Sequence, residues 1–148
     1  TSNLSANSIG QYIFGSLALE TESKLKKWYS KQKKYYKNIL TALRKRLKNN
    51  LPGIIVTEPE AAIYMILDFK NICDPGFDAE KFILFCAKEG KVLYDEKFYT
   101  VLLAPMNGFY RDSNLGKTQL RLAIVENQDL MEISSDIIAG LYYKFINK

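Results

Sequence analysis

Apolar residues recur at three- and four-residue steps along the segment from Lys24 to Lys48. The members of this stripe are Leu25, Trp28, Tyr29, Gln32, Tyr36, Ile39, Leu40, Leu43 and Leu47. This spacing predicts an amphipathic helix about 25 residues long. The following Asn49-Asn-Leu-Pro-Gly53 sequence ends the helix because proline and glycine do not continue it. We expect a helix with so much apolar surface to line an interface or to join two bodies.

The rest of the pattern predicts a small body of short strands and helices. Helical spacing indicates an N-terminal helix before the long one, and further helices over residues 78–90 and 130–145. Short apolar runs between turn residues predict strands over 54–57, 62–69, 92–94, 100–104 and 119–125, and both faces of 62–69 are expected to be largely buried. The predicted fold class is α/β, or an α+β small domain: a long connecting helix and a small mixed sheet covered by helices.

Length and composition indicate a globular protein. The chain has 148 residues, of which 47% are hydrophobic and 25% charged, and domains usually have about 100–200 residues. We therefore expect one domain, or two at most, and divide the chain into an N-terminal helix with the long helix (1–50) and a body (51–148). The chain begins with Thr1 rather than methionine, so we expect a piece of a longer protein.

Several function classes are excluded by composition. Histidine is absent, which removes imidazole bases, proton shuttles and imidazole metal ligands. Two cysteines, Cys73 and Cys86, are too few for a disulfide scaffold or a four-thiolate zinc site. No apolar run approaches the roughly 18 residues that span a bilayer, and no secretory segment opens the chain. We predict a cytoplasmic protein with no metal site and no membrane association.

The positive charge is concentrated in the long helix. The net charge is +5, yet Lys24–Lys48 holds eleven basic residues and no acid, which leaves ten basic against all sixteen acidic residues elsewhere, a balance of −6. The simpler interpretation is a solvated lysine face, because the aromatic residues belong to the apolar stripe. The alternative is a basic surface that binds nucleic acid or anionic lipid.

One residue suggests binding chemistry. In the predicted strand 119–125, Arg121 alternates with Leu120 and Leu122 and so lies on the opposite face. An arginine in the middle of a strand needs an anion, because its desolvation is costly, and its planar fork matches a carboxylate. Two interpretations stay open: an internal ion pair, or binding of a ligand carboxylate.

The sequence around Arg121 resembles the closing motif of the class I/II aminotransferases, which use pyridoxal phosphate. The motif is Thr100-Val-Leu-Leu-Ala-Pro-Met-Asn-Gly-Phe-Tyr110, then Gly116, then Leu120-Arg-Leu-Ala123. Further resemblances follow in family order: Ile9-Gly-Gln11, the long helix with Trp28 and Tyr35-Tyr36, Pro59-Glu-Ala-Ala-Ile-Tyr64, and the helix Asp78–Gly90 followed by Lys91-Val92. The chain departs from the family where Pro105-Met-Asn-Gly108 replaces a Pro-Gly pair before the phenylalanine. The resemblance covers nearly the whole chain.

The resemblance implies the C-terminal small domain of a fold type I pyridoxal-phosphate enzyme. It makes Arg121 the anchor of the substrate α-carboxylate, places Asn107, Gly108 and Phe109 at the same site, and puts residues 5–7 near the partner subunit's active site. The cofactor's lysine, its acid and its phosphate cup would precede Thr1. The isolated chain is therefore expected to be inactive and to bind no cofactor. The intact enzyme is expected to be a homodimer that acts on amino acids and 2-oxo acids and does not bind nucleic acid.

Two alternatives to an aminotransferase remain. A lyase, decarboxylase or acyl transferase with the same fold would use the same arginine. A non-enzymatic basic module would bind nucleic acid or membrane through Lys24–Lys48, with an affinity that falls steeply as salt rises.

Overall fold

The computed structural model describes residues 7–148, apart from the side chain of Ser113. Its residues group into two compact units, and the boundary falls between Tyr35 and Tyr36, inside the long helix. The division at residue 50 stays a prediction. Of the segment 5–7, Ser5 and Ala6 lie outside the described residues.

The N-terminal unit consists of helical segments with exposed apolar side chains. Helix α1 (Ser8–Ser16) is capped by Asn7, whose side chain accepts a hydrogen bond of 3.0 Å from the Gly10 N–H. A short 3-10 helix, η1 (Leu17–Leu19), follows, and then α2 (Glu22–Asn50) begins. Among residues 7–35 no side chain is buried, and Trp28 is 55% exposed. The predicted stripe is therefore covered only in the later part of α2.

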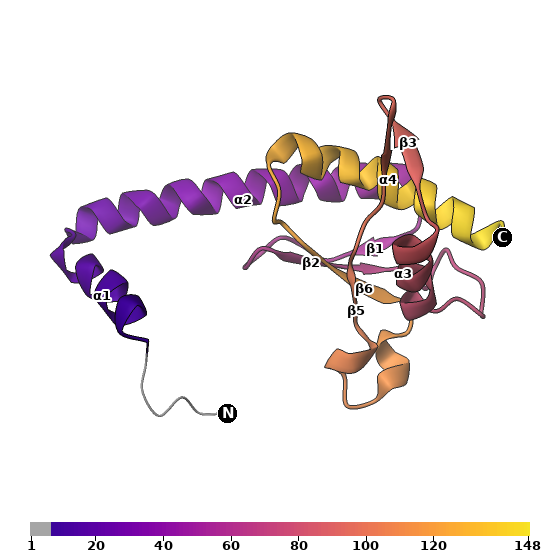
Figure 1. The fold of residues 1–148 in the computed structure, drawn as a ribbon, viewed down its shortest axis with the longest axis horizontal. Helices are drawn as coiled ribbons and strands as arrows, with labels where there is room; N and C mark the ends of the chain where they lie inside the picture. Colours follow the sequence, from indigo (N-terminus) through magenta and orange to yellow (C-terminus); the bar gives the residue numbers. More distant parts are fainter. Residues whose placement is uncertain (1–6) are drawn as a thin grey trace. The chain divides into compact units, whose positions relative to one another are not determined.

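Three helices form one layer of the C-terminal unit (Figure 1). The end of α2 buries Ile39, Leu40, Leu43 and Leu47. Helix α3 (Ala79–Lys88) begins at Asp78, whose carboxylate accepts hydrogen bonds from two N–H groups of its first turn. Helix α4 (Gln128–Ile146) closes the chain and buries Ile138, Leu141 and Tyr142 among others. The predicted long, middle and final helices are all present.

The sheet has the order β1-β2-β6-β5, with strands at Ile55–Val56, Tyr64–Asp68, Gln119–Ala123 and Ala104–Pro105. All neighbouring pairs are antiparallel. The expected α+β small domain is confirmed, but the sheet is not mixed. The reason is that β6 lies between β2 and β5, so these two strands, which share a direction, are not neighbours. A parallel pair would need them to be adjacent.

A separate hairpin lies outside this sheet. Strands β3 (Val92–Tyr94) and β4 (Lys97–Tyr99) pair across Asp95 and Glu96, whose φ angles of 47° and 61° suit a tight two-residue turn. The sequence did not predict β4. It also placed a strand over 100–104, but of that segment only Ala104 is paired, through β5 with β6. Residues 100–103 pair with no strand and instead line a cavity.

The core lies between one face of the sheet and the helices. Met65 and Leu67 of β2 and Leu120 and Leu122 of β6 share this face and are buried. Next to them Phe69, Phe77, Phe82 and Tyr142 form an aromatic cluster with ring centroids 5.1–6.4 Å apart. The opposite face is different: Tyr64 is 45% exposed and Ile66 is half-buried. Asp68, also on this face, is buried, so the expectation that both faces of β2 are largely buried is right at this end of the strand and wrong at Tyr64.

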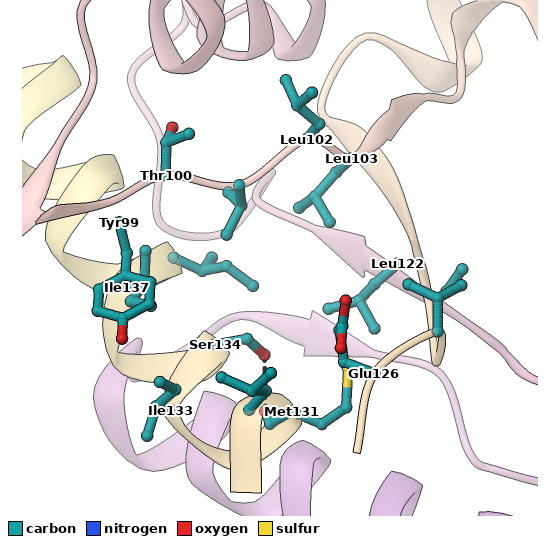
Figure 2. A pocket seen from close by; sticks show the side chains of 15 residues that line it. Tyr99, Thr100, Leu102, Leu103, Leu122, Glu126, Met131, Ile133, Ser134 and Ile137 are labelled. Atoms are coloured by element: carbon teal, nitrogen blue, oxygen red, sulfur yellow. Dashed lines mark hydrogen bonds between the residues drawn. The ribbon is translucent and has the colours of Figure 1, made fainter. Parts of the chain in front are cut away.

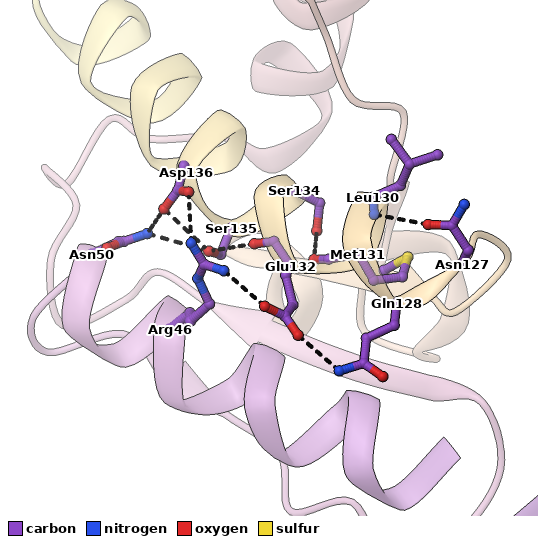
Figure 3. Close-up of polar contacts among 10 residues, drawn as sticks. All are labelled: Arg46, Asn50, Asn127, Gln128, Leu130, Met131, Glu132, Ser134, Ser135 and Asp136. Atoms are coloured by element: carbon purple, nitrogen blue, oxygen red, sulfur yellow. Dashed lines mark hydrogen bonds and ion pairs between the residues drawn. The ribbon is translucent and has the colours of Figure 1, made fainter. Parts of the chain in front are cut away.

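Polar contacts join α2 to α4 (Figure 3). Arg46 donates hydrogen bonds of 3.1 Å to Glu132 and to Asp136, one from each terminal nitrogen. One turn further along α2, the Asn50 amide donates to Ser135 at 3.3 Å and also to Asp136. Arg44 forms an ion pair with Glu58 and donates to the carbonyl oxygen of Val56 at 3.2 Å. Both arginines of the basic segment thus hold the C-terminal unit together.

Candidate functional site

Arg121 lies in the middle of β6, on the sheet face that points away from the core. In the register of the sheet it stands opposite Ile66 of β2 on one side and Ala104 of β5 on the other. Tyr64 stands opposite Ala123 and is therefore a diagonal neighbour of Arg121 on the same face. The alternation predicted from the sequence holds, because Leu120 and Leu122 are buried on the other face while Arg121 is half-buried.

Two aromatic rings contact the guanidinium. Its central carbon, Cζ, lies 4.7 Å from the centroid of the Tyr64 ring and 4.8 Å from that of Phe109. These distances are within the range of cation–π attraction. Tyr64 is 45% exposed and Phe109 56% exposed, so both residues are accessible to solvent. The guanidinium is held by aromatic faces on the sheet surface.

The same guanidinium has no acidic partner within residues 7–148. The ion pairs among the described residues involve Lys24, Lys26, Arg44, Arg46 and Lys148, and none of them involves Arg121. No buried nitrogen or oxygen of a described side chain lacks a hydrogen-bond partner, so the unpaired N–H groups of Arg121 reach solvent. Of the two interpretations of this arginine, the internal ion pair is absent from the part of the chain that the structure describes.

Phe109 is brought to Arg121 by the loop that connects β5 to β6. The loop contains η2 (Asn107–Phe109) and η3 (Ser113–Gly116). Gly116 packs directly on the backbone of Met106 and Asn107, since a Cβ atom placed there would lie 2.5 Å from the Asn107 nitrogen. Only glycine allows so close an approach. The glycine of the motif thus fixes the loop that carries Phe109.

The other predicted site residues have different surroundings. The Asn107 side chain donates to Glu80 at 3.1 Å and accepts from the Gly108 N–H at 2.9 Å, so its polar atoms are already engaged. Gly108 is exposed, and no atom lies within 4 Å of the position of a Cβ there. The structure brings Phe109 and Arg121 into contact, while Asn107 bonds to α3. The role of all four as substrate contacts stays a prediction.

A hydrogen-bonded carboxylate lies further along the same face. Asp68 is only 6% exposed. It accepts hydrogen bonds from the Thr118 hydroxyl (2.7 Å), the Gln119 amide (3.0 Å) and the Lys70 N–H (3.0 Å). Gln119 in turn accepts from the Tyr110 hydroxyl at 2.7 Å. These contacts satisfy the carboxylate without Arg121, which is a further reason why the arginine is uncommitted.

Sequence reasoning missed the position of Tyr64 beside Arg121. The Pro59–Tyr64 motif does not reveal it, because this position depends on the pairing of β2 with β6. A diagonal cross-strand relation exists only once the register is known. The small residues Ala104 and Ala123 around the arginine were a weak signal, since they leave space for a ring.

Neither cysteine is primed to act as a nucleophile. Burial raises the pKa of the Cys86 thiol to about 12, and it also raises the pKa of Cys73, with a smaller contribution from Asp68 and Asp74. Both thiols are therefore protonated at neutral pH. Residues 7–148 contain no group of three acidic or thiol side chains arranged to hold a metal ion. In the same range no helix has the length and apolar character needed to cross a membrane.

An apolar cavity of about 390 Å³ lies at the edge of the sheet (Figure 2). Residues 99–103 form one wall, the end of β6 and the residues after it form a second, and α4 contributes Met131, Ile133 and Ile137. Arg121, Tyr64 and Phe109 do not line it. The cavity therefore adjoins the arginine face at Ala123 but does not include the guanidinium or its two aromatic neighbours.

The arginine face does not fit the whole of a pyridoxal phosphate site. Its residues in register are Ile55, Tyr64, Ile66, Asp68, Ala104, Gln119, Arg121 and Ala123. This set contains no lysine to bind the cofactor covalently, and its acid, Asp68, already accepts three hydrogen bonds. Of the groups that such a site needs, this face supplies only the Arg121 guanidinium, which can bind a carboxylate.

Comparison with known proteins identifies the fold. No family model matches the chain, and no curated protein matches its sequence. Solved structures of aminotransferases do match. The alpha-aminoadipate aminotransferase LysN from Thermus thermophilus is 15% identical, over 77% of this chain and 26% of that protein, with a TM-score of 0.58. Kynurenine aminotransferase from Pyrococcus horikoshii is 20% identical, over 76% of this chain and 25% of that protein, with a TM-score of 0.59.

A third match is the multiple substrate aminotransferase of Thermococcus profundus, 16% identical over 75% of this chain and 24% of that protein, with a TM-score of 0.58. The LysN structure holds N-(5'-phosphopyridoxyl)-L-leucine. The chain spans about a quarter of the length of these proteins. It has the fold of an aminotransferase domain, which confirms the resemblance seen in the motifs.

Proposed function

We propose that this chain is the C-terminal small domain, with its connecting helix, of an amino-acid:2-oxo-acid aminotransferase. In the intact protein Arg121 binds the α-carboxylate of the substrate. The observation that carries the proposal is the guanidinium of Arg121, which is reachable from solvent and has no acidic partner among the described residues. Its position on a domain with an aminotransferase fold supports the same conclusion.

The chemistry follows from the planar guanidinium. Its N–H groups donate two parallel hydrogen bonds to the two oxygens of a carboxylate, which sets both the position and the orientation of the amino or oxo acid. Bound pyridoxal phosphate would supply the electron sink for the amino-group transfer. The cofactor and its lysine would come from a large domain, since the arginine face holds neither a lysine nor a free acid. The isolated chain is thus proposed to be inactive.

Two further elements belong to this proposal. The exposed apolar residues of α1 and of the first half of α2, among them Tyr12 and Trp28, would pack against the large domain or the partner of a homodimer. Asn107 and Gly108 would border the substrate. A lyase, decarboxylase or acyl transferase of the same fold would use Arg121 in the same way, and only the substrate tests separate these activities.

The alternative of a nucleic-acid module finds less support. Arg44 and Arg46 are bonded to carboxylates, and Lys24 and Lys26 pair with acids one turn earlier, Glu20 and Glu22. The basic helix is thus partly neutralised. We expect only weak binding of nucleic acid that disappears at physiological salt.

The test is carboxylate binding by the chain itself. In a ¹H–¹⁵N spectrum that resolves the arginine Nε–Hε groups, addition of 4-methyl-2-oxopentanoate should shift the signal of Arg121 more than that of Arg111. Arg121→Lys should lower the affinity at least tenfold, because lysine cannot form the bidentate pair. Arg111→Lys, at an exposed arginine outside the site, should not change it. Equal affinities in the unsubstituted protein and Arg121→Lys would refute the proposal.

A second test applies to the intact enzyme. There Arg121→Lys should raise the KM for amino and 2-oxo acids, because the lost bonds anchor the substrate. Unchanged substrate affinity and turnover would count against the assignment.

A further inference from the structure

Tyr64 has an unusual position for a large aromatic residue. It is 45% exposed on β2 and no part of its ring belongs to the core, yet it lies 4.7 Å from Cζ of Arg121. Phe109, which comes from a different segment of the chain, lies at almost the same distance on the same guanidinium. Two exposed rings from separate elements therefore converge on one cation.

We infer that Tyr64 and Phe109 form an aromatic clamp that positions the Arg121 guanidinium for a planar carboxylate. In this arrangement Tyr64 is a positioning residue: it acts on the ligand through the arginine. The inference rests on the proposed function, because it concerns the same carboxylate site.

The physical advantage of rings over acids is that they hold the cation without neutralising it. The negative face of an aromatic ring attracts a guanidinium, but it carries no net charge and leaves the in-plane N–H donors available. A carboxylate in the same place would occupy those donors and cancel the charge. No acid does so within the described part of the chain.

Restricting the side chain also favours binding. A free arginine samples many rotamers, and a ligand that orders it loses affinity to that entropy. Contacts with two rings reduce the number of rotamers before the ligand arrives. The clamp therefore preorganises the donor fork, and the effect should appear as tighter carboxylate binding.

Small residues on the neighbouring strands leave space on the sheet for the clamp. The residue opposite Tyr64 is Ala123, and the residue opposite Arg121 on β5 is Ala104. Cross-strand neighbours have Cβ atoms only about 4.5–5.5 Å apart, so small side chains at these two positions leave space over the sheet for a ring and a guanidinium. Phe109 is held by a hydrogen bond of 3.0 Å from its N–H to the Met106 carbonyl and by the close packing of Gly116 on the same turn.

The first measurement detects the clamp in the chain of residues 1–148 without ligand. Protons above or below an aromatic ring are shielded, so the Hε signal of Arg121 should lie upfield of that of Arg111. Tyr64→Phe keeps the ring and should keep the shift. Tyr64→Leu and Phe109→Leu each remove one ring and should move the signal downfield. A merely structural role for Tyr64 would not change this signal while the amide spectrum stays the same.

The second measurement is the affinity of each variant for 4-methyl-2-oxopentanoate. Tyr64→Leu and Phe109→Leu should each weaken binding roughly two- to fivefold, the factor that corresponds to one exposed cation–π contact. Tyr64→Phe should bind like the unsubstituted protein. The phenylalanine variant is the matched control, because it removes the hydroxyl and retains the ring.

The outcomes separate this inference from the proposed function. If Arg121→Lys loses binding but both leucine variants bind as the unsubstituted protein does, the clamp is refuted and the carboxylate site remains. If the unsubstituted protein shows the upfield signal but binds no carboxylate, the proposed function is refuted. The aromatic contacts with Arg121 then exist, but they do not position it for a carboxylate. If Tyr64→Leu fails to fold, Phe109→Leu provides the same test from the loop.

Discussion

Arg46 and Arg121 are both half-buried arginines in the C-terminal unit, but their neighbours differ. Arg46, on α2, donates to two carboxylates of α4, Glu132 and Asp136. Arg121, on β6, touches two aromatic rings and forms no ion pair with any described residue. The difference teaches where to look for function: a cation whose hydrogen bonds are satisfied inside the protein supports the fold, and a cation with free donors is available to a ligand.

The surroundings of the two residues follow the same division. Near Arg46, the Asn50 amide donates a further hydrogen bond from α2 to Ser135 of α4 (Figure 3), and the same part of α2 contributes buried leucines to the core. Next to Arg121 the sheet face is open, and its acid, Asp68, is bonded to other residues. Measurements of stability and of carboxylate binding should therefore respond differently to substitutions in the two regions.

The largest expected effect is in the hydrophobic core, to which α2 contributes Leu47. Leu47 is fully buried, and Leu47→Ala should lower the free energy of unfolding by about 3 kcal/mol, because it removes buried methyl groups and leaves a cavity. Urea denaturation measures this change. Leu19→Ala is the control, since Leu19 is 87% exposed, and it should change stability by at most a few tenths of a kcal/mol. Similar losses in both variants would mean that Leu47 does not lie in the core.

Gly116→Ala should affect both stability and binding. The added Cβ atom would lie 2.5 Å from backbone atoms of Asn107 and Met106, so the loop must shift, at a cost of about 2 kcal/mol. The shift would also displace Phe109 and weaken carboxylate binding. Gly108→Ala, where a Cβ meets nothing within 4 Å, should leave stability nearly unchanged in the same denaturation experiment. A stable Gly116→Ala variant with unaltered binding would show that the loop does not place Phe109.

Arg46→Ala should destabilise the chain by about 1 kcal/mol. It removes two ion pairs that are partly exposed, and such pairs contribute little each because solvent screens them. Lys45→Ala, at an exposed position of the same helix, is the control and should have no measurable effect. Carboxylate binding at Arg121 should be the same in both variants. If Arg46→Ala impaired binding, the two arginines would not be independent.

Arg121→Leu should lower stability by no more than about 1 kcal/mol, because it loses two exposed cation–π contacts but no internal ion pair among the described residues. Its effect on binding should be the opposite: the shift produced by 4-methyl-2-oxopentanoate should disappear from the spectrum. A large loss of stability in Arg121→Leu would instead reveal a structural arginine and remove the contrast with Arg46.

Much of this structure could be predicted from local features of the chain. The stripe of α2, the Asp78 cap of α3 and the proline and glycine after Asn50 determine helices and their ends through contacts between near neighbours in sequence. The alternation in Gln119–Val125 likewise placed Arg121 opposite the buried leucines. The sequence alone therefore determined that Arg121 lies in the middle of a strand, opposite buried leucines, but not whether an acid pairs with it.

Only the tertiary structure decided what surrounds that charge. The insertion of β6 between β2 and β5 makes the sheet antiparallel, and it brings Tyr64 beside Arg121 and sets Ala104 and Ala123 around them. Residues 100–103 were expected in a strand, but they line a cavity against α4 instead. The physical reason is that strand partners and register depend on contacts between distant segments, which local patterns do not encode. The aromatic contacts of Arg121 exist only because that pairing forms.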